Sequence, residues 1–556
     1  MQKTFIASLA LAFAGLAASA SAQTVVGADI VADTTWGGAA NPGPIILELP
    51  IFVKDGATLT ILPGTIVRGQ PRTAAVLAGS TVGTPGALIV TRSGRIIADA
   101  SSTSPIIMTT AAVDNDDDGI ADDDNNDGFD DAWSPGDVFL DDDPANAPLA
   151  PLDKAGNANV AKWGGLVING NAPTNLADDC GTPYGTCTVE GLTIPGFPVS
   201  DATYGGDFPH DNSGILRYVS VRHAGDEIGA NNELNGISLG GVGDGTVVEN
   251  VEVYANFDDG VEWFGGTVNA KNLHVAFVGD DVFDTDEGYT GVNQFMFGVM
   301  PFFNENDGDP FGSASGDKAG EFDGDNDPNV NVRIQSGLPV GGDDPTCWPL
   351  TTNQNYNLTV IGSTPDAGQE FVPASPNSAN RGIQMRNGYA GRLLNSIVVN
   401  TGTAKGLDLD SSAGCPGFTV DDNVGTGLVA MVSSTLDDTA ALGADELAAV
   451  SMGDALAPGL GGTANTVNNA LFPGLENEDT TFDPTGNAAG KLDSSLKASP
   501  IDPRPRFGLI GVGGGVVPQG PELEASATYR GAFLRTAPEL WTTGWTVLNI
   551  AGLLAD

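Results

Sequence analysis

The sequence contains few basic residues. Its 23 Lys and Arg stand against 71 Asp and Glu, which gives a formal net charge of −48 at pH 7. A protein that binds nucleic acid needs clustered Lys and Arg to neutralise phosphates, so this composition excludes nucleic acid as a partner. An anionic membrane surface is excluded for the same reason. The excess of carboxylates suits a highly soluble protein or, where the carboxylates cluster, a protein that binds cations.

Long apolar runs are also scarce. No segment approaches the ~20 apolar residues of a membrane-spanning helix, so we expect no membrane insertion. The uncharged apolar stretch at residues 5–18 follows Lys3 and precedes the small-residue sequence Ala20-Ser21-Ala22. This order is the pattern of a signal peptide. We therefore expect residues 1–22 to be removed and the mature chain to be exported to the periplasm, the extracellular space or the cell surface.

Cysteine is rare as well. The four cysteines are Cys180, Cys187, Cys347 and Cys415, and their spacing is not that of a zinc site. An oxidising compartment permits two disulfides. The short loop between Cys180 and Cys187 favours that pair, which leaves Cys347 for Cys415, but three pairings are formally possible and the sequence does not decide among them.

Lysine and glutamate, which long helices favour, are few, whereas the sequence contains 76 glycines. Frequent Gly together with Val, Ile and Thr predicts many short strands joined by tight turns. The strand patterns recur at a regular spacing: Gly236 and Gly260 are 24 residues apart, as are Ile383 and Leu407. A period of this length indicates a solenoid, in which coils stack at ~4.8 Å and bury one continuous core.

Three asparagines occupy equivalent places in these repeats, before the strand sequences VEVYAN, LHVAFV and IVVNTG. They are Asn250, Asn272 and Asn395. An asparagine suits a turn at such a place. We therefore expect each of them to bend its coil and to hydrogen-bond to the asparagine one coil away.

The repeats resemble the right-handed parallel β-helix superfamily, which includes pectate lyases, polygalacturonases and many exported surface proteins. The resemblance covers roughly residues 40–420 and implies an all-β solenoid. We expect the β-helix to span residues 23–420, with Asp-rich insertions at 114–143 and 301–355, and residues 421–556 to form a C-terminal capping region. Insertions usually leave one face of a solenoid and often carry its function.

Nearly the whole chain is also similar to uncharacterised exported proteins of Gram-negative bacteria, which share WGGL, LRYVS, DDG-E-FGG and a terminal YRGAF-W-GW. This second resemblance implies no established activity. The terminal motif contains Trp541 and Trp545, four residues apart. We expect these tryptophans to belong to a cap over the last coil, because an open solenoid end exposes unpaired strand edges. A patch that binds a partner is the alternative.

The strongest chemical signal is the sequence DNDDDGIADDDNNDGFDD. The candidate ligands recur after nine residues, as Asp114, Asp116, Asp118 and Asp122, then as Asp123, Asn125, Asp127 and Asp131. Calcium requires six to eight hard oxygen ligands, which alternating Asp and Asn on a tight loop supply. Neither loop has the Glu that an EF-hand carries at its twelfth position. The loops resemble the thrombospondin type 3 repeats, which implies Ca²⁺ binding. A solvated acidic loop is the alternative.

A second acidic group lies on the coils themselves. When VSVRHAGDEIG, VEVYANFDDGVEWF and LHVAFVGDDVFD are aligned, the matching acidic residues are Asp226 with Asp258 and Asp280, Glu227 with Asp259 and Asp281, and Glu262 with Asp284. Carboxylates stacked this closely need a cation or a raised pKa. We therefore expect calcium bound by this row, with Asp226, Glu227 and Asp284 among its ligands. A glycoside hydrolase acid/base pair and a solvated row of turns are the alternatives.

The hydrolase alternative has some motif support, because Gly279-Asp280-Asp281 resembles the Gly-Asp-Asp of polygalacturonases. That resemblance implies catalytic roles for Asp280 and Asp281 alone. In the enzyme alternative, Asp258 and Asp259 of the preceding repeat would act with them. The downstream Gly-His-Gly and Arg-Ile-Lys of that family do not occur, so we favour a binding protein over an enzyme. A lyase of this fold pairs calcium with an Arg or Lys base, and Arg217 and Arg222 are the nearest candidates.

Aromatic residues flank the acidic row and could stack on sugar rings or belong to the core. They are Tyr254, Phe257, Trp263, Phe264, Phe283 and Tyr289. The sequence thus predicts an exported, calcium-binding β-helix protein with a structural, adhesive or glycan-binding role at the cell surface. Its expected partners are polysaccharides or other cell-surface components. The alternative is a carbohydrate-active enzyme, either a hydrolase or a lyase.

Overall fold

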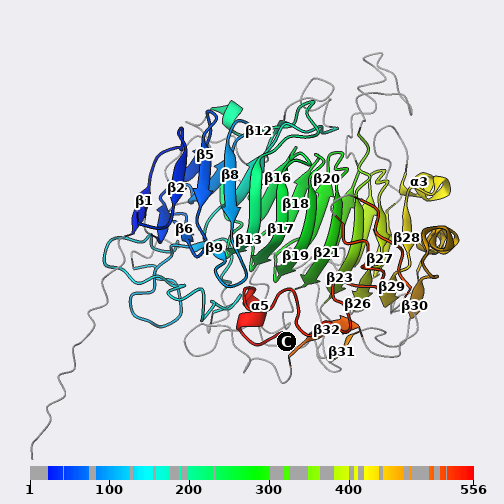
Figure 1. Ribbon diagram of the computed structural model, residues 1–556. Helices are drawn as coiled ribbons and strands as arrows, with labels where there is room; N and C mark the ends of the chain where they lie inside the picture. The colour runs from blue at the N-terminus through cyan, green and yellow to red at the C-terminus, as the bar shows by residue number, and fades with distance from the viewer. Residues whose placement is uncertain are drawn as a thin grey trace, which may run out of the picture.

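The computed structural model describes residues 23–555 except for a set of short segments. The residues left out within that range are 40, 42, 74–82, 125–128, 154–157, 176–186, 190–197, 230–231, 301–317, 325–348, 363–380, 400–405, 411–418, 438–441, 469–474, 477–499, 506–513 and 521–522. The described part is dominated by short strands stacked side by side from one end of the molecule to the other (Figure 1). Within it, no helix has the length and apolarity that crossing a bilayer would require.

One long sheet forms the first face of the solenoid, and we name it sheet 1. Its nine strands pair in parallel throughout. They are β4 (Pro50–Val53), β7 (Ala87–Val90), β10 (Gly165–Asn169), β16 (Ile237–Gly240), β18 (Val261–Phe264), β20 (Phe283–Asp286), β22 (Lys318–Asp323), β24 (Arg381–Arg386) and β27 (Leu407–Leu409).

A seventeen-stranded sheet forms the other two faces. Its strands are β1 (Thr24–Val26), β2 (Thr34–Trp36), β3 (Ile45–Leu47), β5 (Thr58–Ile61), β6 (Ile66–Gly69), β8 (Arg95–Asp99), β9 (Ile106–Thr110), β13 (Gly214–Arg222), β17 (Val247–Tyr254), β19 (Asn269–Ala276), β21 (Val292–Val299), β23 (Gln354–Ile361), β25 (Arg392–Leu394), β26 (Ile397–Val399), β28 (Ala430–Val432), β29 (Thr435–Asp437) and β30 (Thr466–Asn468). The first half of β13 pairs with β8 and its second half with β9, so this sheet has two faces. We name the upstream face sheet 2 and the downstream face sheet 3.

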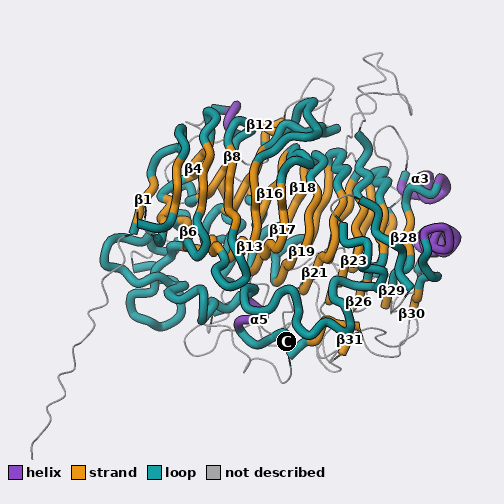
Figure 2. Tube along the Cα trace, viewed as in Figure 1, coloured by secondary structure: helices purple, strands orange, loops and turns teal. Residues whose placement is uncertain are grey.

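The short elements lie outside these sheets. They are the paired strands β11 (Cys187–Thr188) and β12 (Thr203–Tyr204), β14 (Glu227–Gly229) and β15 (Asn232–Glu233), and β31 (Leu475–Glu476) and β32 (Asp502–Pro505), with the helices η1 (Val199–Asp201), α3 (Val420–Thr426), α4 (Ala444–Leu456), η3 (Ala457–Leu460) and α5 (Val547–Ile550). Strands far outnumber helices (Figure 2). The predicted all-β parallel β-helix is therefore confirmed.

A column of residues with left-handed backbone separates sheet 2 from sheet 3. It includes Asn250, Asn272 and Asn395, each with φ between 55° and 58°. Asparagine tolerates this conformation better than most residues, which explains its place at the bend. Asn272 Nδ2 donates a hydrogen bond to Asn250 Oδ1 at 3.0 Å, which confirms the predicted contact for this pair. For Asn395 the prediction is wrong, because its amide bonds instead to the backbone of Val516 and Ala527.

The core fills the interior of the solenoid because equivalent positions on successive coils stack in register. Val251 pairs with Leu273, which pairs with Met296, and all three are buried in the interior cluster. Burial of each such side chain contributes roughly 1.5–3 kcal/mol relative to exposure. A single coil could not bury these residues. The apolar positions that repeat in the sequence are therefore buried only because the coils stack.

The Asp-rich insertion leaves the solenoid between β9 and β10, at residues 111–164, and so extends beyond the predicted 114–143. It is anchored to the body by an aromatic pair, Trp133 and Phe139, whose ring centroids lie 5.5 Å apart. The buried guanidinium of Arg68 lies 4.1 Å from the Phe139 ring, and it donates to the Thr110 carbonyl at 2.7 Å. These contacts pack the insertion against the body of the solenoid.

The predicted insertion at 301–355 needs a correction. Residues 318–323 within it form β22, a full member of sheet 1, and β23 begins at Gln354. The sequence around β22 is rich in Asp and Gly, so the strand lacks the apolar alternation by which the others were recognised. Residues 301–317 and 325–348 of this stretch lie outside the described residues.

The C-terminal region also differs from the expected cap. Strand pairing continues through β28, β29 and β30, well past residue 420. Helices α3 and α4 lie at that end of the solenoid and contribute Val424, Ala449 and Val450 to the interior cluster (Figure 1). Residues 514–520 and 523–555, which we name the strap, instead run back along the outside of sheets 2 and 3. Trp545 is buried there against Tyr218, with ring centroids 5.3 Å apart, and does not cover the last coil.

Candidate functional site

The acidic row lies on the outer face of sheet 1, and strand register builds it. Glu262 on β18 pairs with Asp284 on β20, which pairs with Glu321 on β22. The same column continues through Gln384 and Asp408. Neighbouring strands bring equivalent residues ~4.8 Å apart, so the offset shared by Glu262 and Asp284 in the sequence becomes a direct contact in space.

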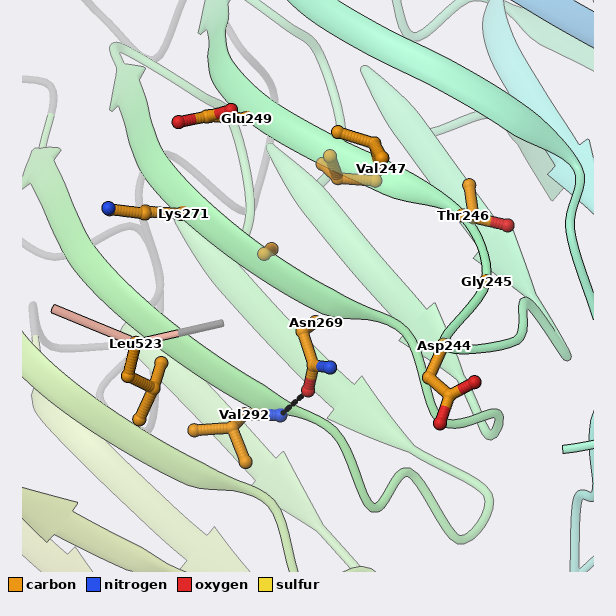
Figure 3. Close-up of a pocket in the computed structure, with 11 residues that line it drawn as sticks. Asp244, Gly245, Thr246, Val247, Glu249, Asn269, Lys271, Val292 and Leu523 are labelled. Carbon is orange, nitrogen blue, oxygen red and sulfur yellow. Dashed lines mark hydrogen bonds between the residues drawn. The ribbon is translucent and has the colours of Figure 1, made fainter. Parts of the chain in front are cut away.

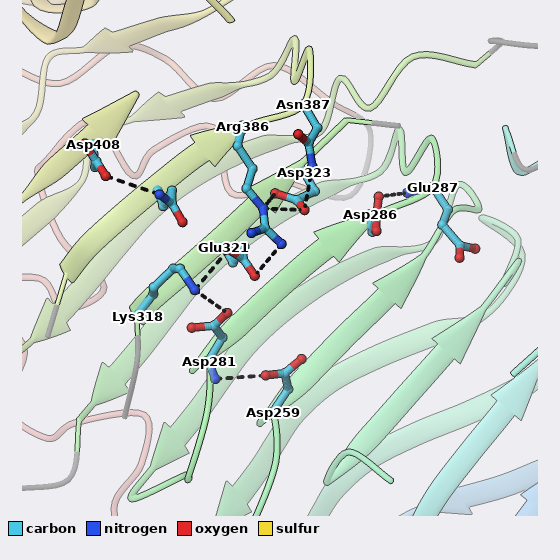
Figure 4. Close-up of polar contacts among 11 residues, drawn as sticks. Asp259, Asp281, Asp286, Glu287, Lys318, Glu321, Asp323, Arg386, Asn387 and Asp408 are labelled. Carbon is cyan, nitrogen blue, oxygen red and sulfur yellow. Dashed lines mark hydrogen bonds and ion pairs between the residues drawn. The ribbon is translucent and has the colours of Figure 1, made fainter. Parts of the chain in front are cut away.

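The turns that precede these strands add a second column. The Gly236 N–H donates to the Asp259 carbonyl, and the Gly260 N–H donates to the Asp281 carbonyl, both at 2.9 Å, so Asp259 and Asp281 occupy equivalent places on adjacent coils. The backbone N–H of Asp281 also donates to Oδ1 of Asp259 at 2.8 Å (Figure 4). The predicted match of Asp259 with Asp281 on adjacent coils is thus confirmed.

The two columns, together with Asp258 and Asp280 directly before the second one, bring carboxylate oxygens within ligand distance of a common centre. One oxygen each from Asp258, Asp259 and Asp280 lie within 4.8 Å of one another, and so do one oxygen each from Asp259, Asp281 and Asp284. Asp259 belongs to both groups. Oxygens bound to one calcium ion at 2.3–2.6 Å cannot be farther apart than about 5 Å, so both groups have a spacing that a cation can bridge.

The carboxylates of the row are poorly solvated. Burial raises the pKa of Asp259, Glu262, Asp281 and Asp284 well above the ordinary carboxyl value, and neighbouring carboxylates raise the pKa further. Asp281 is 1% exposed, and its Oδ1 is buried without a hydrogen-bond partner, as is Oδ1 of Asp284. A buried acceptor without a donor costs roughly 1–3 kcal/mol, so a ligand that supplies positive charge here would be strongly stabilised.

Two basic residues lie within the row, and sequence reasoning missed both. Lys318 Nζ lies 3.5 Å from Asp281 and 3.0 Å from Glu321. Arg386 extends from β24 to Glu321 at 3.0 Å and to Asp323 at 2.7 Å (Figure 4). Burial raises the pKa of Asp323 well above its usual value, although Arg386 opposes that shift. Arg386 could have been found in the sequence, because the pattern of its strand RGIQMR predicts a coil. Lys318 was missed because it lies in the stretch that we predicted to be an insertion.

The structure corrects the alignment at Glu227 but keeps Asp226 in its predicted place. The Phe257 N–H donates to the Ala224 carbonyl as the Gly279 N–H donates to the Asn256 carbonyl, so Asp226, Asp258 and Asp280 follow equivalent residues on successive coils. The hairpin β14–β15 is inserted directly after Asp226, and Asn235 takes the place above Asp259 instead. Asp226 lies 3.3 Å from the guanidinium of Arg72, and Glu227 pairs with the same group. Burial raises the pKa of Asp226 to about 7, partly offset by Arg72. Neither residue belongs to the two groups of converging oxygens that contain Asp259.

The first Asp-rich loop forms a tight turn around Asp114, whose carboxylate accepts from the backbone N–H groups of Asp118 and Gly119 at 3.0 and 2.7 Å. Oxygens of Asp114, Asp116 and Asp122 lie within 4.8 Å of one another. Desolvation and the three neighbouring aspartates raise the pKa of Asp116. In the described part of the loop, these are the predicted ligands that converge.

The nine-residue repeat of the loop has a structural counterpart. The carboxylate of Asp122 accepts from the Asn115 N–H at 2.9 Å, and that of Asp131 accepts from the Asp124 N–H at 3.0 Å, nine residues further on. Two of the predicted ligands, Asn125 and Asp127, lie outside the described residues. Asp118 and Asp123 border the turn, with Asp118 Oδ1 accepting from the Ile120 N–H.

The aromatic residues and the arginines singled out in the sequence do not contribute to the acidic row. Trp263, Phe283 and Tyr289 point into the interior core, while Tyr254 and Phe264 are buried under segments that cover the outer faces and Phe257 is partly buried, so the aromatic set belongs to packing. Arg217 pairs with Glu249 on sheet 2, and Arg222 is buried beside Glu252 on sheet 3. Neither arginine faces the acidic row.

The disulfide prediction remains a prediction. Cys180, Cys347 and Cys415 lie outside the described residues, so the structure places only Cys187, in β11.

Comparison with known proteins agrees with this architecture. The family model described as a pectate-lyase like β-helix domain matches residues 146–457, more than half of the chain, and includes the whole acidic row. No curated protein and no solved structure gives a significant match. The family match suggests a surface or carbohydrate-related protein. The chain belongs to the pectate-lyase-like β-helix domain family.

Proposed function

We propose that this protein is exported, binds calcium along the outer face of sheet 1, and acts at the cell surface in a structural, adhesive or glycan-binding role. The observation that carries the proposal is the convergence of carboxylate oxygens from Asp259, Asp281 and Asp284, in a group where Oδ1 of Asp281 and Oδ1 of Asp284 are buried without a hydrogen-bond donor. Such an arrangement is costly for the free protein and becomes favourable when a cation binds.

The ligand chemistry favours calcium over other metals. The described row offers only carboxylate and amide oxygens, which are hard ligands, and neither of its two converging groups contains His or Cys. Zinc prefers nitrogen and sulfur, and magnesium requires a near-ideal octahedron, whereas calcium accepts six to eight oxygens in flexible geometry. Because Asp259 belongs to both groups, the row has room for one ion or for two ions that share this carboxylate.

The Asp-rich loop supports the same proposal from a second place. Asp114 is 5% exposed and is fixed by two backbone hydrogen bonds, so its carboxylate has a defined orientation next to Asp116 and Asp122. Calcium at this loop would offset the repulsion among these aspartates. We propose one to two ions in the loop, with a stabilising role.

A role in glycan binding is supported by the family and by the shape of the face. Stacked coils repeat equivalent groups every ~4.8 Å along a rigid surface, which suits a polymeric partner better than a small one. Calcium held on that surface would reverse its local negative charge and permit acidic polysaccharides or other cell-surface components to approach.

A carbohydrate-active enzyme is the second candidate, and Lys318 and Arg386 favour it. Lyases of this fold combine calcium with a basic residue, and here the carboxylates proposed to hold calcium lie on the same face as these two basic residues. Asp259 and Asp281, whose pKa values are raised, could alternatively serve as general acids of a hydrolase. The close approach of the carboxylates suits cation binding better than the wider separation of an inverting hydrolase.

One experiment separates these functions. The purified protein is incubated with acidic and neutral polysaccharides in calcium and in chelator, and both retention and new reducing ends or unsaturated products are scored. Retention that requires calcium, that is lost in Asp281→Asn and that is kept in the control Asp99→Asn on sheet 2, supports the proposal. Cleavage that disappears in Asp280→Asn and Asp281→Asn would establish the enzyme instead. If the protein shows neither retention nor cleavage, a purely structural role remains.

A further inference from the structure

The chain places a cation of its own in the column of Asp259 and Asp281. The Gly260 N–H donates to the Asp281 carbonyl at 2.9 Å, and the Val282 N–H donates to the Lys318 carbonyl at 3.0 Å. Lys318 therefore holds, one coil further on, the place that Asp259 and Asp281 hold on their coils. Two acids of this column are followed by a base, so the charge of the column changes sign at this coil.

The ammonium of Lys318 lies between two carboxylates. Its Nζ is 3.5 Å from Oδ2 of Asp281 and 3.0 Å from Oε1 of Glu321 (Figure 4). The exposed fractions of Lys318, Asp281 and Glu321 are only 6%, 1% and 7%. A lysine is rarely buried in this way unless its charge is compensated. The ammonium is therefore the counter-ion of these two carboxylates.

A lysine on another face shows what is particular to this one. Lys271 lies opposite Glu249 in the strand register of sheet 2, beside a groove of about 370 Å³ (Figure 3). Both side chains are partly exposed there, so water screens their charges. Lys318 and its two carboxylates are shielded from water, and the charges between them act at nearly full strength.

The carboxylates around Lys318 also have the arrangement of a cation site. Asp284 is the register partner of Glu321, and it shares a group of converging oxygens with Asp281. Oδ1 of Asp281 and Oδ1 of Asp284 are buried without a hydrogen-bond partner. The ammonium contacts the other oxygen of Asp281, so it leaves these two acceptors unsatisfied. They point to a ligand that Lys318 does not replace completely.

Calcium and the ammonium would compete at Asp281. An ion held at 2.3–2.6 Å from an oxygen of this carboxylate would lie close to Nζ of Lys318, and two cations repel strongly where water is excluded. The other group of converging oxygens, from Asp258, Asp259 and Asp280, does not include the carboxylate that Lys318 contacts. The lysine should therefore weaken calcium binding in one group more than in the other.

We propose that Lys318 is a built-in cation that limits calcium binding on the acidic row. Its ammonium takes the place of an ion between Asp281 and Glu321 and weakens calcium binding at the group that contains Asp281. The row then binds fewer ions than its carboxylates could hold. The inference rests on the proposed function, because it concerns the same face, and it adds the residue that sets how many ions bind there.

The test counts the calcium ions bound to the full-length mature protein by equilibrium dialysis with elemental mass spectrometry, and calorimetry gives their affinities. Lys318→Met should bind one ion more than the wild type, and the group of Asp281 should bind calcium about tenfold more tightly. In chelator at pH 8 the variant should melt at a lower temperature than the wild type, because two buried carboxylates lose their counter-ion. Calcium should restore the difference.

Two further variants separate charge from other effects. Lys318→Arg keeps the positive charge and should bind as many ions as the wild type. Lys54→Met is the matched control, because Lys54 also lies between two carboxylates, at 2.6 Å from Asp29 and 2.7 Å from Asp201, but outside the row. It should leave calcium binding unchanged. If Lys318→Met does not fold in calcium, Lys318→Gln is measured with the same expectation.

Three results would overturn the inference. The first is a folded Lys318→Met or Lys318→Gln variant that binds calcium with the number and affinity of the wild type. The second is an additional ion in Lys318→Arg, and the third is an equal gain in Lys54→Met.

Failure of this inference and failure of the proposed function give different results. An Asp259→Asn variant that binds as many ions as the wild type would show that the wild-type row binds no calcium, which contradicts the proposed function. The inference would still hold if Lys318→Met gained an ion, and it would fail if no ion were gained. Where the wild-type row does bind calcium, unchanged binding in Lys318→Met contradicts the inference alone.

Discussion

The backbone N–H of Asp281 donates a hydrogen bond to Oδ1 of Asp259, one coil away, at 2.8 Å. This bond fixes the orientation of the Asp259 carboxylate and places it beside the equivalent carboxylate of the next coil. The stacking that stabilises the solenoid therefore also forces like charges together at this face. Desolvation and repulsion make the row unfavourable when empty, and this cost is the reason why we propose that it binds calcium.

The first prediction concerns pH. The folded pKa values of Asp259, Asp281 and Asp284 are raised, so the folded state binds more protons than the unfolded state above the ordinary carboxyl pKa of ~4. In chelator, the free energy of unfolding should therefore fall as pH rises through the raised values, with Asp226 contributing up to about 7. Urea unfolding at pH 5 and pH 8 measures this slope.

Calcium should flatten the same pH profile, because it holds the carboxylates of the row ionised. At calcium concentrations about 100-fold above Kd, each bound ion should add ~2.7 kcal/mol at pH 8. A profile in chelator that rises from pH 5 to pH 8, or one that calcium leaves unchanged, contradicts the prediction.

The second prediction concerns Asp281→Asn. The substitution removes a buried charge but keeps the shape of the side chain, so in chelator at pH 8 it should stabilise the protein by ~1–3 kcal/mol. In calcium it should remove most of the calcium-dependent stabilisation of the row. Asp99→Asn is the control, because Asp99 pairs with Arg217 on another sheet. Destabilisation by Asp281→Asn in chelator would show that the row is not strained by its own charge.

The third prediction concerns the strap. Trp545 is fully buried against sheets 2 and 3, and beside it the Val547 N–H donates to Glu252 at 2.6 Å. Trp545→Ala should therefore cost roughly 3–5 kcal/mol. Trp541→Ala is the matched control, since Trp541 is only partly buried, and it should cost less. Equal costs measured by urea unfolding would indicate that the strap is not docked as described.

The fourth prediction concerns the Asp-rich loop. Calcium should protect residues 114–143 from a broad-specificity protease, and chelation should expose them. Asp114→Asn should abolish this protection, because Asp114 organises the turn. Asp142→Asn, an exposed change in the same insertion, serves as the control. Cleavage fragments identified by mass spectrometry check the prediction, and identical cleavage in calcium and in chelator would contradict it.

The sequence predicted those parts of the fold that depend on the regular period. Asn250 with Asn272 and Glu262 with Asp284 were matched correctly because each pair is separated by one uninterrupted coil. Glu227 was matched wrongly because it begins the inserted hairpin β14–β15, so that Asn235 takes the place opposite Asp259. An inserted hairpin changes the register in space without disturbing the local sequence pattern.

Other features depend on contacts that local patterns do not encode. Lys318 was missed because its strand is polar and lies among Asp and Gly, so only pairing with β20 and β24 shows it to be a coil. The strap was missed because its contacts join distant residues: Glu252 and Val547 are 295 positions apart. No period in the sequence links them. The sequence around Trp545 does not distinguish a tryptophan that the strap buries against sheets 2 and 3 from one in a cap over the last coil.

Calcium stoichiometry is the most direct test of the central claim that the acidic row binds calcium. Equilibrium dialysis followed by elemental mass spectrometry counts the ions bound to the wild type, to Asp259→Asn and to Asp114→Asn. Because Asp259 belongs to both groups of converging oxygens, Asp259→Asn should lose the one or two ions of the row and keep those of the loop. Asp114→Asn should show the reverse. An Asp259→Asn variant that binds as many ions as the wild type, with the same affinity, would contradict the account.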